Sequence, residues 1–408
     1  MLCFHVNFMM LPLMRAVGSL SRILVAAACC WGIWQSLLLA RADSLFKQDT
    51  ELSVRAAIGL VPDEPNYYMR LSEIDSANAQ SLLTKSLRFN RFNAQADIEL
   101  GLQYEIEGDL GQAEKQLLQA YDVNHTYMPR WTLANFYFRR NNMPEFWRWA
   151  RSAAAMPKED IGALFVLCWR ASPDAGQISK AILNENPDMI RQYIRFLLGR
   201  DQVIAAAGIA PLLFRTGDAK SDLPMMFAVV DKLVLSSDGS SAGALWRRLS
   251  EQNWVTADSA IPYNGGFLRE PLGVVFDWSL PDYPDLHSWP GPSGLETEFS
   301  GNQPEEATIA EQALILKPGK YAMSYSYRTT DISPASGIRW QILDAETDTV
   351  LEESAYLSSD ALLYSGFGFS VPPTAPLVRV RLDYQRALGT PRISGMLDVS
   401  STRIQSLP

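Results

Sequence analysis

The residues DIELGLQYEIEGDLGQAEKQLLQA, at positions 97–120, return in altered form as WTLANFYFRRNNMPEFWRWARSAA at positions 131–154. The second copy follows at a period of about 34 residues, which is typical of helix–turn–helix repeats. Ala120 in the first copy thus corresponds to Ala154 in the second. Helices of such repeats bury their apolar faces only by stacking on their neighbours. The stretch therefore predicts a helical repeat domain, a kind of structure that usually holds partners.

The helical pattern extends well beyond these two copies. From about Ser44 to Trp254, apolar residues recur at spacings of three and four, and Pro, Gly and Asn-Asn breakers separate them. Ala57 and Pro62 keep the closing spacing of a repeat, and Tyr68-x-x-Leu71 opens a shortened copy. After about residue 160 the repeat motif fades while the helical pattern persists, which predicts degenerate helical repeats there.

The first copy carries a recognisable set of residues on each side of the turn at Gly108-Asp109. These residues are Leu100, Gly101, Tyr104, Ala113, Leu117 and Ala120. The set resembles the tetratricopeptide repeat, whose pattern runs W-x-x-L-G-x-x-Y and then A-x-x-x-F. In the second copy, Trp147 stands at the position that Ala113 holds in the first, where the family has a small residue. The resemblance implies paired antiparallel helices and a groove that binds protein partners.

Near residue 262 the texture changes to Pro-rich and Gly-rich turns between alternating apolar and polar segments. Lys320–Tyr327 shows the alternation well, because every second residue from Tyr321 to Tyr327 is a large apolar or aromatic one. Six to nine such strands predict an antiparallel β-sandwich. The segments that we expect to form strands include 273–278, 320–327, 337–343, 367–371, 377–384 and 393–399.

The sandwich region also carries a composite signature. It consists of Gly301, the turn Leu316-Lys-Pro-Gly-Lys-Tyr321 and the pair Gly337-x-x-Trp340. This combination resembles the jelly-roll fold of carbohydrate-binding modules, which implies glycan as a ligand. Together with the repeats and an apolar N-terminal segment, the architecture resembles that of bacterial envelope proteins that assist in the assembly of exported polysaccharides.

The N-terminal segment is long and apolar. Arg15 and Arg22 precede a run from Ile23 to Ala40 that contains no charged residue. A helix of this length nearly spans a hydrocarbon core of about 30 Å. We expect an uncleaved signal anchor that leaves the bulk of the chain on the exported, periplasmic side. The alternative is a secreted protein cleaved near Ala42, because Ala40-Arg41-Ala42 resembles a signal-peptidase site.

Composition excludes some classes of function. The net charge of −9 argues against nucleic-acid binding, which requires Lys and Arg to neutralise phosphates. The chain has only three His residues and four Cys residues, and Cys168 is the only Cys beyond the N-terminal segment. No metal-ligand spacing, phosphate-binding loop or nucleophile motif occurs, so we expect no metal, no cofactor and no enzymatic activity.

Candidate binding residues follow from the two resemblances. In tetratricopeptide repeats the first helix of each unit lines the groove, which implies that Thr132, Phe136, Arg139 and Arg140 bind a partner. An Arg pair there could hold a carboxylate. In the sandwich, Tyr283 and Trp289 lie in a Pro-rich segment, where aromatic rings could stack on sugars. Trp278 and Trp340 share the phase of apolar neighbours and are expected in the core.

These features predict a multidomain α + β protein. The expected parts are an N-terminal transmembrane anchor (1–43), tetratricopeptide-like repeats (44–160), degenerate helical repeats (161–261) and an antiparallel, jelly-roll-like β-sandwich (262–408). The expected function is that of a non-enzymatic envelope scaffold, with envelope or polysaccharide-assembly proteins and glycan as expected partners. The alternative is a polysaccharide-active enzyme, a glycoside hydrolase or lyase, with catalytic carboxylates in the sandwich.

Overall fold

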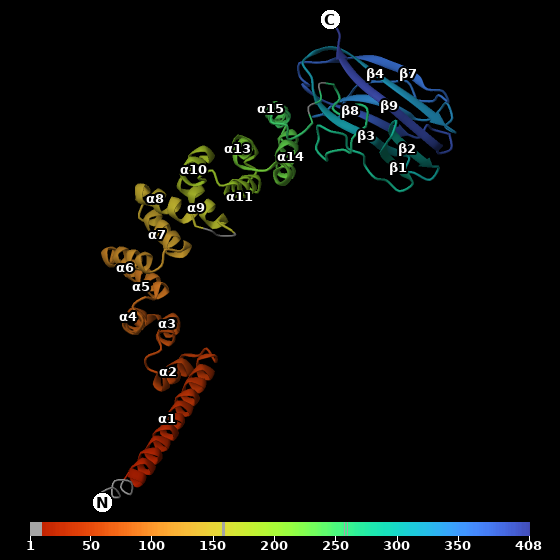
Figure 1. The fold of residues 1–408 in the computed structure, drawn as a ribbon. Helices are drawn as coiled ribbons and strands as arrows, with labels where there is room; N and C mark the ends of the chain where they lie inside the picture. The colour runs from red at the N-terminus through yellow and green to blue at the C-terminus, as the bar shows by residue number, and fades with distance from the viewer. Residues whose placement is uncertain (1–9, 157–159, 257, 259) are drawn as a thin grey trace, which may run out of the picture. The chain divides into compact units, whose positions relative to one another are not determined.

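The computed structural model describes residues 10–156, 160–256, 258 and 260–408 (Figure 1). The chain forms two compact units, of which the first ends at Ala171 and the second begins at Ser172. The first unit is helical. The second unit contains further helices and then two antiparallel sheets, so the fold is the expected α + β combination of helical repeats and a β-sandwich.

The helices of the first unit follow one another as antiparallel neighbours. They are α1 (Met10–Phe46), α2 (Glu51–Leu60), α3 (Pro65–Ile74), α4 (Ala79–Phe89), α5 (Ala94–Glu107), α6 (Leu110–Val123), α7 (Tyr127–Arg139), α8 (Met143–Ala154) and α9 (Gly162–Ala171), with a short 3₁₀ turn at Ser76–Asn78. Side chains in the connecting turns cap several of these helices. Asn93, Asp109 and Asn142 each accept a hydrogen bond from a backbone N–H in the first turn of the following helix.

Helix α1 contains a stretch of 23 residues, Leu24–Phe46, that is long and apolar enough to cross a membrane. At about 1.5 Å per residue, such a stretch exceeds the roughly 30 Å of a hydrocarbon core. A signal sequence near an N-terminus has the same properties. The expected apolar N-terminal helix is therefore present.

The helix bounds show that the second repeat copy follows the first at a spacing one residue shorter than expected. Ala94 begins α5 and Tyr127 begins α7, while Leu110 begins α6 and Met143 begins α8. This shorter register pairs Gly101 with Ala134, and both are buried. The expected register was wrong because it matched Trp131 to the tryptophan of the repeat pattern by residue type alone. Trp131 is only half-buried, so its residue type was a poor guide to its position in the packing.

The corrected register shows how the two copies pack. A Cβ atom on Gly101 would lie 2.7 Å from Leu117 Cδ2, so the absence of a side chain lets Leu117 approach α5 closely. In the second copy, Phe146 and Ala150 stand where the first has Ala113 and Leu117, and all four are buried. Large and small residues have exchanged places. Trp147 is half-buried and does not occupy the small-residue position.

One ionisable side chain lies inside the α5–α6 pair. Asp97 is only 2% exposed, and its Oδ1 accepts a hydrogen bond from Gln116 Nε2. Its Oδ2 has no hydrogen-bond partner among the described residues. Burial raises the pKa of Asp97 to about 6, and the Gln116 hydrogen bond opposes this shift.

We predict that Asp97→Asn stabilises the first unit at pH 7. The pKa of Asp97 is about 6 in the folded unit and about 4 in the unfolded chain, so the folded unit loses stability as the pH rises from about 4 to about 6. The difference between these two pKa values corresponds to a loss of about 3 kcal/mol. The amide keeps the contact with Gln116 and carries no charge. Hydrogen exchange of α5 and α6 should slow in the variant at pH 7 and change little at pH 4. An equal effect at both pH values would contradict this account.

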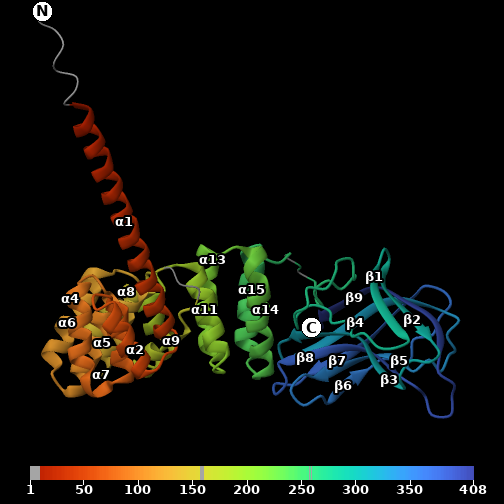
Figure 2. The same cartoon turned by 90° about the horizontal axis from the view of Figure 1, so that it is seen from below.

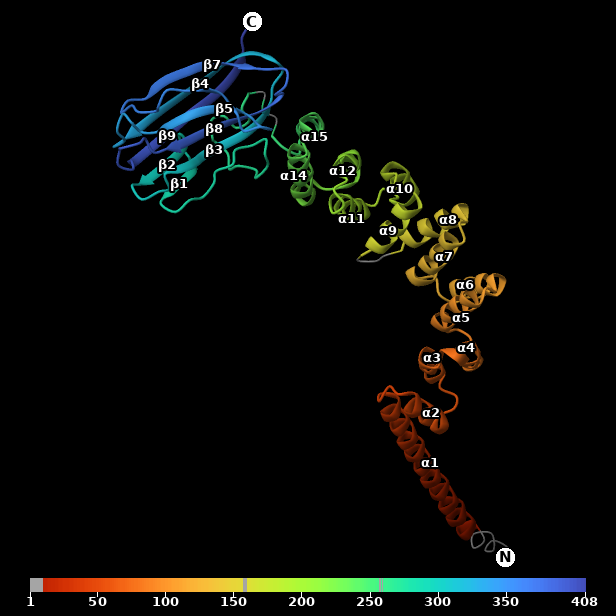
Figure 3. The ribbon, with the colours of Figure 1, turned by 180° about the vertical axis from the view of Figure 1, so that it is seen from behind.

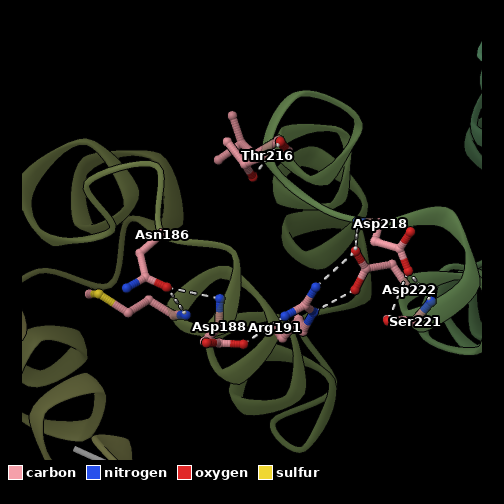
Figure 4. Close-up of polar contacts among 9 residues, drawn as sticks. Asn186, Asp188, Arg191, Thr216, Asp218, Ser221 and Asp222 are labelled. Carbon is pink, nitrogen blue, oxygen red and sulfur yellow. Dashed lines mark hydrogen bonds and ion pairs between the residues drawn. The ribbon is translucent and has the colours of Figure 1, made fainter. Parts of the chain in front are cut away.

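The second unit begins with shorter and less regular helices. They are α10 (Ala175–Ile182), α11 (Pro187–Leu198), α12 (Val203–Ile209), α13 (Leu213–Thr216), α14 (Ala219–Leu235) and α15 (Gly239–Glu251), with a 3₁₀ turn at Ala210–Leu212. A polar network joins α11 to α14 (Figure 4). Arg191 Nε lies 2.5 Å from Asp222 Oδ1, and Arg191 Nη2 donates to Oδ2 at 3.2 Å. Asp222 is fully buried and also accepts the backbone N–H of Asp218 at 2.9 Å.

We predict that Arg191→Met destabilises the helices of the second unit by about 3–5 kcal/mol, because it leaves the buried Asp222 carboxylate without its charged partner. The matched control is Arg215→Met. Arg215 pairs with Glu185, and both side chains are 68% exposed, so its loss should cost at most about 1 kcal/mol. Hydrogen exchange of α11 and α14 measures both effects. Equal effects from the two variants would show that the network contributes no special stability.

The second unit continues as two antiparallel sheets packed face to face (Figure 3). The strands are β1 (Leu286–Gly291), β2 (Gly294–Ser300), β3 (Glu306–Ile315), β4 (Gly319–Thr330), β5 (Ile338–Asp344), β6 (Val350–Glu353), β7 (Leu363–Val371), β8 (Leu377–Gln385) and β9 (Ser394–Ser406). One sheet has the order β1-β2-β9-β4-β7 and the other β3-β8-β5-β6. Alternate residues of β4 are buried as expected, and Trp278 and Trp340 are fully buried in the core between the sheets.

The segment 273–278 is not a strand, contrary to expectation. It forms a turn in which Asp277 N donates to Val274 O at 2.9 Å, and Gly273 has a φ of +70° that interrupts extended backbone. Val274, Phe276 and Trp278 are nevertheless buried. The segment lies along the edge of the four-stranded sheet, where Ala313 N donates to Val275 O at 2.9 Å. Burial without a full strand explains why its alternation resembled one.

Helix α15 packs directly on this edge of the sandwich. The Trp246 ring lies 5.4 Å from Tyr263 and 5.9 Å from Phe276, centroid to centroid. A Cβ on Gly243 would lie 2.2 Å from Ile315 Cδ1, so the end of the Ile315 side chain packs directly on the α15 backbone at this glycine. The last helix of the second unit is thus part of the support for the sandwich.

Candidate functional site

The four residues expected to line a partner groove do not form a common surface. Thr132 and Phe136 are buried at 5% and 2% exposure, which contradicts their expected place on a binding face. The Thr132 hydroxyl donates to Met128 O within the helix at 2.9 Å. Phe136 packs inside because buried residues lie around most of α7, and its ring lies 5.2 Å from that of the neighbouring Tyr137, centroid to centroid.

The two arginines remain on the surface and differ in their partners. Arg139 donates through Nε and Nη2 to the two oxygens of Glu105, at 2.8 Å and 2.6 Å. This bidentate pair links α7 to α5, so Arg139 is committed within the protein. Arg140 is exposed, and its guanidinium lies 5.9 Å from the centre of the Phe136 ring. Of the four expected residues, Arg140 is the one whose charge is available to a partner.

The two aromatic residues expected to bind glycan also differ in their exposure. Trp289 lies in the middle of β1 and is 36% exposed on the outer face of the five-stranded sheet. Tyr283 is half-buried against the core, and its hydroxyl accepts the backbone N–H of Thr308 at 3.4 Å. Tyr283 therefore supports the edge of the sandwich, and Trp289 is the better placed of the two for a ligand.

Trp289 is the first member of a row of side chains across four strands. Strand register pairs it with Glu296 on β2, Glu296 with Asp398 on β9, and Asp398 with Arg328 on β4. Trp289 Nε1 donates to Glu296 Oε2 at 3.1 Å. Arg328 donates to Asp398 Oδ2 through Nη2 at 2.8 Å and through Nε at 3.2 Å. We call these four residues the Trp289 row.

The row has the composition of a surface for polyhydroxylated ligands. An indole face suits the C–H side of a sugar ring, while carboxylates and a guanidinium exchange hydrogen bonds with hydroxyl groups. The hydrogen bonds within the row hold these side chains in place before a ligand arrives. Because the row carries two carboxylates and one guanidinium, its net charge is negative, which disfavours acidic ligands.

A groove on the same face extends the polar surface. A cavity of about 430 Å³ is lined by residues that include Ser324, Ser401, Arg403, Asp258 and Arg269. Arg269 Nη2 donates to Asp258 Oδ2 at 2.9 Å. Burial tends to raise the pKa of Asp258, but the backbone N–H groups of Ala260 and Asn264 and the Arg269 guanidinium outweigh it and hold that pKa below its usual value. The ion pair thus gives the groove a fixed polar wall.

A metal site, a reactive thiol and a paired histidine are the other kinds of chemistry to consider among the described residues. No group of three or more His, Cys, Asp or Glu side chains in the described part of the chain could hold a metal ion. Burial raises the pKa of the Cys168 thiol to about 12, so this cysteine carries no reactive thiolate near neutral pH. His287 Nδ1 lies 3.5 Å from Asp282 beside the Trp289 row, where both side chains are exposed.

Sequence reasoning singled out Trp289 but did not assign the other three members of the row to a binding site. Glu296, Arg328 and Asp398 lie far apart in the chain, and only the pairing of β2, β9 and β4 brings them together. The alternation of β4 and β9 could have assigned their outward direction. Nothing in the sequence could have set their register, because register depends on turns and bulges between distant strands.

Comparisons with known proteins match the two kinds of architecture separately. No family model matches the chain, and no curated protein matches it. Among solved structures, it is similar to a CBM4 module, with 11% identity over 36% of this chain and 99% of that chain, and a TM-score of 0.28. It is also similar to TmCBM61 in complex with β-1,4-galactotriose, with 8% identity over 37% of this chain and 100% of that chain, and a TM-score of 0.26.

A third similar structure belongs to the repeat class. It is the C-terminal part of a TPR repeat-containing protein from Cytophaga hutchinsonii, with 14% identity over 53% of this chain and 95% of that chain, and a TM-score of 0.29. The helices and strands of the protein themselves define its class: antiparallel helical repeats followed by an antiparallel β-sandwich.

Proposed function

We propose that this protein is a membrane-anchored, non-enzymatic envelope scaffold in which the sandwich binds glycan and the helical repeats bind a protein partner. The apolar stretch of α1 would anchor it, with the two units on the exported, periplasmic side. Exopolysaccharide or surface-glycan assembly is the process that this combination fits. The single observation that carries the proposal is the Trp289 row, which presents an exposed indole beside ordered carboxylate and guanidinium groups.

The charge of the row narrows the ligand to neutral glycans. Glu298 follows Glu296 by two residues on β2 and is exposed on the same outer face, and Asp282 lies near it beside His287. An acidic polysaccharide would bring its carboxylates toward these carboxylates and meet repulsion. A neutral chain could lie across the strands, with one ring on Trp289 and hydroxyl groups on the charged side chains.

One observation favours the alternative of a polysaccharide-active enzyme. Glu296 and Asp398 are Cα partners on adjacent strands, and glycoside hydrolysis uses two carboxylates that flank the scissile bond. In this structure both carboxylates accept hydrogen bonds within the row, from Trp289 and Arg328 respectively. This pairing suits recognition more than catalysis.

We predict that Trp289→Ala weakens the binding of neutral polysaccharide by about tenfold, because the loss of a stacking ring costs about 1 kcal/mol or somewhat more. The measurement is affinity electrophoresis or calorimetry of the full chain in detergent against a panel of neutral and acidic polysaccharides. Tyr356→Ala is the matched control. Tyr356 is an aromatic residue of similar exposure, 44%, that packs under Arg339 of the other sheet.

Three outcomes would decide among these readings. Equal losses in the Trp289 and Tyr356 variants would remove the row as the ligand site. Cleavage of a bound polysaccharide that Glu296→Gln or Asp398→Asn abolishes would establish the enzyme instead. Selective binding of acidic polysaccharides would contradict the charge argument.

For the repeats, we predict that affinity capture with the full chain retains envelope or polysaccharide-assembly proteins, and that Arg140→Ala reduces capture severalfold. Arg140 is chosen because its charge is exposed and it forms no ion pair with any described carboxylate. Arg215→Ala, which removes an exposed charge from the second unit, is the control. Recovery of cytosolic proteins alone, with reporter fusions that place the C-terminus in the cytoplasm, would exclude the envelope role.

A further inference from the structure

An exposed basic and aromatic patch lies at the end of α4 and in the loop that leads to α5. It consists of Arg88, Phe89, Arg91 and Phe92, which we call the α4 rim. All four side chains are exposed, and Phe89 and Phe92 are exposed to 50% and 68%. The Arg91 guanidinium lies 4.9 Å from the centre of the Phe92 ring. Two large exposed phenylalanines flanked by cations are unusual on a surface that meets only water.

Contacts within the first unit fix the end of the repeat at which the rim lies. Ser86 Oγ, in the last turn of α4, donates to Pro65 O at the start of α3 at 2.9 Å. The Phe89 ring stacks on Tyr68 at 5.7 Å, and the Tyr68 hydroxyl donates to Pro62 O at 2.8 Å. The α4 rim therefore lies at the same end of the unit as the α2–α3 loop.

Helix α1 leaves the repeat at this same end. Helix α2 runs back along α1 after the turn at residues 47–50, and Ala42 is buried against Ala57 and Tyr67. The end of α2 and the α2–α3 loop consequently lie on the side from which the earlier part of α1 projects. Figure 2 shows α1 extending past the layer of neighbouring helices on one side only. A bilayer that contained α1 would therefore face the rim.

The charges of the rim are not used inside the protein. Arg55 and Arg70, in the same unit, pair with Asp75 and Asp49. Among the described residues, neither Arg88 nor Arg91 forms an ion pair with a carboxylate, and Lys85, one turn earlier on α4, does not either.

Acidic residues at this end of the unit do not neutralise the positive charge of the α4 rim. In the neighbouring α2–α3 loop, Asp63 is exposed, and Glu64 caps α3 by accepting the backbone N–H of Asn66 at 3.1 Å. Asp122 is exposed near the end of α6, beyond the next pair of helices. The basic side chains of the rim and Lys85, in contrast, lie together on one segment, where they can contact the same surface.

We propose that the α4 rim binds the anionic phospholipid headgroups of the bilayer that α1 crosses. Arg88 and Arg91 would contact phosphate groups, and the rings of Phe89 and Phe92 would enter the boundary between headgroups and acyl chains. This proposal rests on the proposed anchor. It deepens that function, because a second contact beside α1 prevents the first unit from pivoting and presents the repeats at a constant orientation to the membrane.

The test uses the full chain in nanodiscs of phosphatidylcholine alone, or of phosphatidylcholine with phosphatidylglycerol at roughly 7:3. Hydrogen exchange of residues 85–93 is the readout. We expect exchange to slow by about tenfold in the anionic discs, because basic residues near an anionic surface are attracted to it. The double variant Arg88→Gln/Arg91→Gln should lose this protection, and raised salt should lower it.

The matched control is Lys115→Gln/Arg148→Gln. It removes two exposed positive charges from the first halves of α6 and α8, and both of these helices begin at the opposite end of the unit. This control should keep the protection of residues 85–93. Phe92→Ala supplies a second variant that leaves the charges unchanged and should weaken the protection partially.

The outcomes separate the rim from the anchor. A chain that stays in the discs but exchanges equally in both lipid compositions would overturn the rim proposal and leave the anchor standing. Protection by soluble polyglutamate but not by phosphatidylglycerol would overturn it in favour of an acidic protein partner. A chain that dissociates from the discs would overturn both proposals.

Discussion

The antiparallel stacking of short helices is the constraint on which the first unit depends. Helices α2 to α8 are too short to be stable alone in water. Each must bury one face against the next, and close approach requires a small residue opposite a large one, as Gly101 lies opposite Leu117. The second copy satisfies the same requirement with Phe146 and Ala150, so the volume is preserved although the sequence pattern is not.

Stacking also sorts the loops of the first unit between two ends. Because successive helices alternate in direction, every second loop lies at the end where α1 leaves the repeat. This alternation places Arg88 and Phe92 beside the expected membrane surface, while Arg140 lies at the far end with Glu105 and Arg139. The two ends of this helical unit therefore present different sets of side chains.

In the sandwich, strand register has the corresponding role. Strand β9 pairs with β2 over its first half and with β4 along its length, so it aligns side chains from both. The row of Trp289, Glu296, Asp398 and Arg328 exists because of this alignment. Below the row, the aromatic core that includes Trp278 and Trp340 holds the two sheets together, and α15 packs against the exposed edge through Trp246.

The amino-acid sequence sufficed to predict the class of each region, because apolar spacing of three and four favours helices, repeated alternation favours strands, and a long uncharged run favours an apolar helix. It placed Trp340 in the core and β4, β5, β7, β8 and β9 close to their observed positions. The tertiary structure alone decided the register of the two repeat copies, the burial of Thr132 and Phe136, the turn at 273–278 and the composition of the Trp289 row. These features depend on which surfaces meet. A helix period does not reveal which of two adjacent residues faces a neighbour, and an alternating strand does not reveal its partner's register.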